Sequence, residues 1–162
     1  MNRLPFIDGY FGAEKLESLL FIAVGALAIA WAVVLLRRRS RLRGMAIPLV
    51  AVALIQLGVG GTVFVRSDAQ IARLQQQARE APADFKRDES ARLRTVIANF
   101  EIYRQIEIGL LALGMALVVL LRNREFGFAF GLGLVLQAGF MLALDRFAEA
   151  RAHEYFKAVL AT

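Results

Sequence analysis

The sequence predicts an all-α integral membrane protein, a four-helix bundle built from two transmembrane hairpins, with a helical hairpin outside the membrane between spans two and three. Apolar residues make up 58% of the 162 residues and the mean hydropathy is +0.54, above the roughly half-apolar composition of soluble domains. These residues gather in four continuous runs. Only helices and closed barrels satisfy their backbone groups in a bilayer, and barrel strands alternate apolar and polar residues. The continuous runs therefore predict helices.

The four apolar runs predict spans over 16–36, 45–65, 102–121 and 126–144, within a single membrane domain over 1–162. An α-helix needs about 20 apolar residues to cross the hydrocarbon core. The third run begins only at Ile108, so we expect its helix to continue outward through 102–107. The first run is not a cleavable signal peptide, because it is too long and its positive charge follows it.

The short loops between paired spans decide the expected orientation. Loop 37–44 carries five arginines, Arg37, Arg38, Arg39, Arg41 and Arg43. A loop this basic is normally retained in the cytoplasm, where its arginines would meet anionic lipid headgroups. We therefore expect loops 37–44 and 122–125 in the cytoplasm and both termini outside. The architecture is similar to that of many small four-span proteins of bacterial inner membranes, which places the termini in the periplasm.

The overall charge neither reverses this orientation nor points to nucleic acid. The outer segments hold 13 Lys and Arg residues against 7 in the two tight loops, so a raw count favours the opposite orientation. The density beside the first span decides, because that helix usually sets the orientation. The basic residues flank spans, so the lipid bilayer is the expected partner.

The motif VVLLR occurs twice, at Val33–Arg37 and Val118–Arg122, which end the first and third spans. Beyond the loops, LIQLG (Leu54–Gly58) matches VLQAG (Val135–Gly139), so that the two mid-span glutamines and the two glycines pair. The matches indicate a duplication of parallel hairpins, as in some transporters, or chance similarity between runs rich in leucine and valine.

Small and amide residues are expected to hold the spans together, because lipid offers no hydrophobic drive between helices. The predicted mid-span polar and packing residues are Gln56, Gly58, Gly60, Gly61, Thr62, Gly127, Gly131, Gln137 and Gly139. Gly127 and Gly131 form a GxxxG pair. We expect the two glutamines to bond to each other, or alternatively to contact a substrate.

Residues 66–105 predict the hairpin outside the membrane. Its first arm ends before Pro82, which disfavours a helical conformation at Ala81. The second arm starts near Asp84 and carries an apolar interaction face, Leu93, Ile97, Phe100 and Tyr103. The arms can cover each other, or this face can bind a second copy or another protein. An amphipathic extension of the fourth span is expected over 145–160, and a short interfacial helix before the first span.

Few residues offer chemistry. The chain has no cysteine, which excludes disulfides and thiol nucleophiles, and His153 is the sole histidine. We predict no catalytic residue, no metal and no cofactor. Arg104, Glu107 and Asp145 are expected as charged residues at the membrane interface, with Arg104 and Glu107 paired on one helical face.

Three functions remain open. The first is a non-enzymatic protein that forms homo-oligomers or binds another membrane protein. The second is a channel or small-solute transporter in which Gln56, Thr62 and Gln137 line the path. The third is an interfacial enzyme or lipid-handling protein that uses the charged residues of the outer interface.

Overall fold

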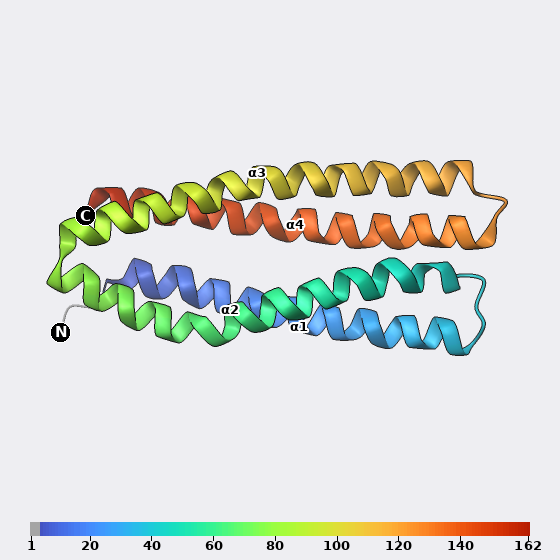
Figure 1. Ribbon diagram of the computed structural model, residues 1–162, viewed down its shortest axis with the longest axis horizontal. Helices are drawn as coiled ribbons and strands as arrows, with labels where there is room; N and C mark the ends of the chain where they lie inside the picture. The colour runs from blue at the N-terminus through green and yellow to red at the C-terminus, as the bar shows by residue number, and fades with distance from the viewer. Residues whose placement is uncertain (1–3) are drawn as a thin grey trace.

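The computed structural model describes residues 4–162, which form four long helices. These are α1 (Pro5–Arg37), α2 (Ala46–Glu80), α3 (Pro82–Leu120) and α4 (Glu125–Ala161), with a short 3₁₀ turn, η1 (Arg43–Met45), before α2. All four run along the long axis of the molecule, with α1 beside α2 and α3 beside α4 (Figure 1). No strand occurs in residues 4–162. The all-α prediction is confirmed.

Each of the four helices is long and apolar enough to cross a membrane. They contain 33 to 39 residues, which is about 50 to 58 Å at about 1.5 Å per residue. This exceeds the roughly 30 Å of a hydrocarbon core. Each helix therefore extends well beyond the length that a membrane would cover.

The extra length lies at one end of the molecule. The two hairpin loops share one end, while both chain termini and the α2–α3 turn share the other (Figure 1). We call segments 16–36, 45–65, 102–121 and 126–144 the apolar half, and segments 4–15, 66–101 and 145–161 the charged half. Because both loops lie at the same end, the two hairpins are parallel, as the VVLLR repeat predicts.

The α2–α3 turn follows from a single proline. Helix α2 ends at Glu80, and Ala81 adopts φ −142° and ψ 70°, outside the helical region. Residues before proline avoid the α conformation, whereas proline itself is accepted in the first helical turn. Helix α3 consequently starts at Pro82, slightly before the expected Asp84. At the other terminus, the expected short interfacial helix is not separate, because α1 runs without interruption from Pro5.

Two apolar clusters hold the bundle together, one in each half. The cluster of the apolar half comprises Ala28, Ala32, Leu35, Met45, Ala46, Leu49, Ala53 and Ala129. The cluster of the charged half comprises Ile7, Phe11, Leu74, Phe85, Leu93, Tyr155 and Val159, and all four helices contribute to it. The two arms of 66–105 therefore do not stand alone, since the start of α1 and the end of α4 pack against them.

Candidate functional site

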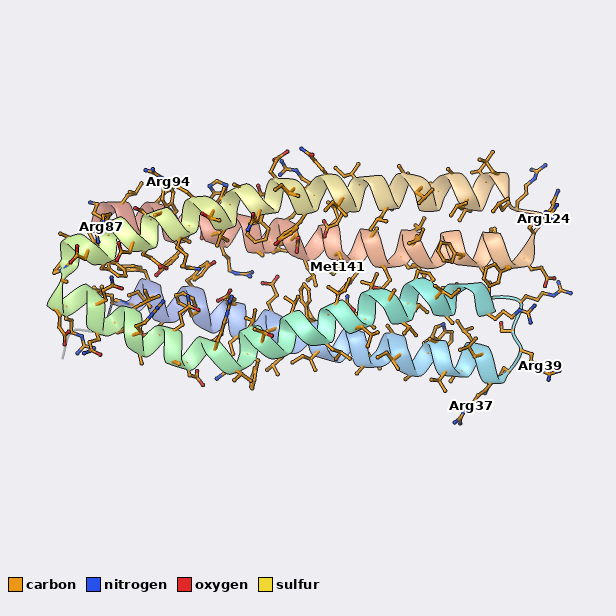
Figure 2. All side chains as sticks on the ribbon, in the orientation of Figure 1. Arg37, Arg39, Arg87, Arg94, Arg124 and Met141 are labelled. Atoms are coloured by element: carbon orange, nitrogen blue, oxygen red, sulfur yellow. The ribbon has the colours of Figure 1, made fainter. Side chains whose placement is uncertain are left out.

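The two mid-span glutamines are both buried, but they do not bond to each other. Gln56 in α2 is fully buried, and its Nε2 lies 3.5 Å from the sulfur of Met141 in α4. Met141 lies near the middle of the bundle (Figure 2). Gln137 in α4 donates to the carbonyl oxygen of Leu49 in α2 at 3.5 Å. The expected mutual bond is wrong; each amide instead makes one long contact between the hairpins.

Two of the predicted glycines lie where helices come close. A Cβ at Gly60 would lie 2.8 Å from the carbonyl oxygen of Ser18 in α1, and one at Gly131 would lie 2.8 Å from the carbonyl oxygen of Gly114 in α3. Gly127 faces the turn before α4 instead of a neighbouring helix. Only Gly131 of the GxxxG pair therefore meets a neighbouring helix.

The other predicted small residues pack against no other helix within residues 4–162. A Cβ at Gly58, Gly61 or Gly139 would meet no atom within 4 Å. Thr62 is exposed and donates only to the carbonyl oxygen of Gly58 in its own helix, at 2.8 Å. A path lined by Thr62 and the two glutamines is therefore not formed inside one bundle. Sequence reasoning assigned no packing role to the close contacts at Gly25, Gly44 and Gly114.

The candidate interaction face is covered in part by the chain itself. Leu93 is fully buried in the cluster of the charged half, so it is not available to a partner. Ile97 and Phe100 are half-buried, and Tyr103 is exposed. The cluster that buries Leu93 includes residues of α1 and α4 as well as of α2, and the sequence could not place α1 and α4 beside this face.

The interfacial charged residues meet partners other than those expected. Arg104 does not pair with Glu107; its Nη1 lies 3.2 Å from Glu149 Oε1 in α4, and it also bonds to Glu101. Glu107 is only 7% exposed, and its carboxyl lies close to that of Asp145 in α4. The two acidic groups thus face each other across the α3–α4 interface.

A cavity of about 130 Å³ lies between the two hairpins, at the boundary of the apolar and charged halves. All four helices line it. Its charged lining residues are Glu14, Glu17, Asp145 and Arg151, and its aromatic ones are Tyr10, Phe21 and Phe100. On the α2 side the wall consists of Val59, Gly60 and Val63.

The charged groups of this cavity are incompletely satisfied. Arg151 in α4 bonds to Glu17 in α1, which joins the two hairpins. Glu14 lies 3.6 Å from the guanidinium of Arg66, and burial raises the pKa of its carboxyl. Nevertheless, Arg151 Nε and Glu14 Oε2 are buried without a partner among residues 4–162. Buried polar atoms are normally hydrogen-bonded, so this donor and this acceptor mark a place for water or a polar ligand.

Beyond the cavity, towards the chain ends, aromatic stacking, an ion pair and a cation–π contact hold the helices of the charged half together. The rings of Tyr10 and Tyr155 stack at 4.3 Å, and burial raises the pKa of Tyr10 to about 12. Buried Glu89 accepts two bonds from Arg92, at 2.7 and 2.8 Å. The Arg92 guanidinium lies 5.5 Å from the centre of the Phe11 ring. These contacts join α1, α3 and α4 beside the cavity.

Sequence reasoning assigned no role to Glu14, Glu17 or Arg151. The available signal was weak: Arg151 precedes buried Tyr155 by one helical turn, so it lies on the inward face of the α4 extension. His153, on the same extension, is exposed. Within residues 4–162, no group of three or more acidic or histidine side chains could hold a metal ion.

The arginines of loop 37–44 form the opposite pole of the molecule. All five are exposed, and Figure 2 shows Arg37 and Arg39 at the loop end. Arg41 lies 3.4 Å from Glu125, but both side chains are largely exposed. Such a surface pair contributes little to stability, and the guanidinium groups remain accessible.

No known protein family, curated protein or solved structure matches this chain. Its function is therefore argued from its own geometry.

Proposed function

We propose that this chain is an integral membrane protein that binds and moves a small polar solute, with the cavity between the hairpins as its binding site. The main observation in its support is that charged side chains line this cavity, and that Glu14 and Arg151 each have a buried atom with no partner in the described part of the chain. Charged groups inside a membrane protein usually mark the path of a solute or ion. In this proposal the apolar half spans a bacterial inner membrane, loops 37–44 and 122–125 are cytoplasmic, and the charged half is periplasmic.

The arrangement of the hairpins supports a role in transport. Helix α1 packs mainly against α2, and α3 mainly against α4, so each hairpin is a natural rigid unit. In transporters built from parallel repeats, the substrate lies at the interface of the repeats and one unit rocks against the other. The cavity lies at this kind of interface, since both hairpins line it.

A ligand screen by thermal unfolding tests this proposal. A solute that binds only the folded protein raises its unfolding temperature. The full chain, purified in mild detergent, would be heated with a panel of small ammonium, carboxylate and neutral solutes. We expect one solute class to stabilise the natural protein but not the Asp145→Asn variant. His153→Gln serves as the matched control on the same helix, because His153 is exposed. Stabilisation by no class, or equal stabilisation of the Asp145→Asn variant, would contradict the proposed site.

A second candidate function is self-association through α2. Among the described residues, no other helix packs against Gly58 or Gly61, and Thr62 is exposed; small residues allow helices to approach closely within a membrane. We expect Gly58→Ile to dissociate an oligomer seen by native mass spectrometry in mild detergent. Gly109→Ile, at an equally open glycine of α3, should leave it intact. A natural protein that is strictly monomeric would refute this candidate.

A further inference from the structure

The net charge of the chain is concentrated at one end of the molecule. The two hairpin loops carry seven arginines, against one acidic residue, Glu125, at the start of α4. This end therefore holds the whole net charge of +6, while the rest of the chain, with 13 basic and 13 acidic residues, is neutral. We call these seven arginines the arginine pole; they are Arg37, Arg38, Arg39, Arg41, Arg43, Arg122 and Arg124.

The two loops form one surface at this end (Figure 2). The turn η1 packs against α4, and a Cβ at Gly44 would overlap the carbonyl oxygen of Phe126. Loop 37–44 is therefore held against the start of α4, where Arg41 lies 3.4 Å from Glu125. All seven arginines are exposed, and within residues 4–162 this contact is the only ion pair that any of them makes.

The arginine pole directly borders the apolar half. Between the pole and the charged half, the chain has no Asp, Glu, Lys or Arg in segments 18–36, 45–65, 108–121 and 126–144. Where these segments cross a bilayer, the guanidinium groups lie at the depth of the lipid headgroups. A guanidinium group binds phosphate through paired N–H donors, and Glu125 alone competes for those donors.

Arg39 takes its place in the arginine pole at a cost to the backbone. Its φ is +46°, and it is the one non-glycine residue among residues 4–162 with a positive φ. The turn that ends α1 requires this conformation, because the amide nitrogens of Arg39 and Ser40 bond to the carbonyl oxygens of Leu36 and Leu35, both at 3.2 Å. Glycine usually occupies this position, since a side chain is strained there. Strained residues of this kind gather at functional sites, so Arg39 indicates that a positive charge is needed in this turn.

We propose that the arginine pole binds anionic phospholipids through their phosphate groups, in preference to zwitterionic phospholipids. This inference is independent of the solute cavity. Each arginine near a membrane surface strengthens the attraction to anionic lipid by about fivefold. A zwitterionic headgroup carries its own ammonium group, which the arginines repel, so its phosphate is a poorer partner.

Trp31 provides a probe of the lipids beside the arginine pole. It is the single tryptophan of the chain, its side chain is 55% exposed, and it precedes Arg37 by about 9 Å along α1, at about 1.5 Å per residue. The full chain would be reconstituted in equal amounts of phosphatidylglycerol and phosphatidylcholine, with one or the other lipid brominated on its acyl chains. Bromine quenches tryptophan fluorescence on contact, so the ratio of the two quenching levels gives the lipid preference.

We expect brominated phosphatidylglycerol to quench Trp31 more strongly than brominated phosphatidylcholine. Replacing all seven arginines with glutamine should abolish the difference. Equal quenching of the natural protein by the two lipids would overturn the inference, whatever the solute screen shows. Quenching by neither lipid would refute the membrane placement of the apolar half, and the inference with it. Inorganic phosphate at constant ionic strength should leave the preference unchanged; its loss would overturn the inference by showing that a free anion occupies the arginines.

Arg39→Gly separates the charge from the fold, because its effects on stability and on lipid binding have opposite signs. Glycine relieves the strained conformation, so the unfolding temperature in mild detergent should rise by about 2 to 4 °C. The preference for phosphatidylglycerol should fall, by up to about fivefold. Arg39→Lys keeps the charge and should keep the preference. Arg94→Gln is the matched control, because Arg94 is an exposed arginine of the charged half, at the other end of the molecule (Figure 2). An unchanged preference in Arg39→Gly, or an equal loss in Arg94→Gln, would overturn the inference.

Discussion

Gly131 allows a sharp test of how α3 and α4 are held together. Alanine at this position places a Cβ 2.8 Å from the carbonyl oxygen of Gly114 and 2.8 Å from the Cβ of Leu117. Neither neighbour is the end of a flexible side chain, so the helices themselves must separate. Overpacking of this kind costs about 1 to 3 kcal/mol. Against this, alanine gains up to about 1 kcal/mol of helix propensity over glycine.

The matched control is Gly139→Ala on the same helix, where a Cβ meets no atom within 4 Å. Both variants receive the same gain in propensity, so the difference between them isolates the close contact. We expect Gly131→Ala to have a free energy of unfolding about 1 to 3 kcal/mol below that of Gly139→Ala. Titration of a denaturing detergent into mild micelles, followed by circular dichroism, measures both. Equal stability of the two variants would show that α3 and α4 do not approach closely at Gly131.

Three further predictions follow from individual contacts. Buried Gln75 bonds to both the amide nitrogen and the carbonyl oxygen of Leu4 at 3.0 Å, so Gln75→Ala should lower the free energy of unfolding by about 1 to 3 kcal/mol. Exposed Gln76→Ala should lower it by less than about 0.5 kcal/mol, and equal losses would contradict the role of Gln75. The Oε1 of Gln56 is buried without a partner, so Gln56→Leu should leave stability unchanged or raise it by about 1 kcal/mol; a large loss in thermal unfolding would reveal an unseen partner. Replacing the five arginines of 37–43 with glutamine should lower the activity of an alkaline phosphatase fused to the C-terminus, because that enzyme needs an outside location and the arginines hold the loop inside. An inactive alkaline phosphatase fusion to the natural protein would show that the C-terminus lies inside, opposite to the proposed orientation.

The number and extent of the helices were predictable because they depend on short-range physics. An apolar run of about 20 residues has few ways to satisfy its backbone, and each run lies within one helix apart from at most one terminal residue. The break before Pro82 follows equally from local sterics. The two matched glutamines, Gln56 and Gln137, are both buried inside the bundle.

The partners of those residues could not be predicted in the same way. Helical periodicity identifies which residues share a face, but it does not say which neighbour that face meets. Gly58 and Gly60 lie in the same apolar run, and the sequence predicted packing at both. Only Gly60 lies against another helix. Leu93 belonged to an apolar stripe, and the cluster in which it is buried draws on all four helices, including both ends of the chain.

The sequence by itself determined an all-helical chain with four helices fit to cross a membrane, because composition and backbone hydrogen bonding act within each segment. Only the tertiary structure decided the charged cavity. The contact between Glu17 and Arg151 joins residues 134 positions apart, and the approach of Glu107 to Asp145 depends on how α3 slides and rotates against α4. The axial position and rotation of one helix relative to the other are set by packing over the whole length of both helices. No local pattern in the chain encodes them.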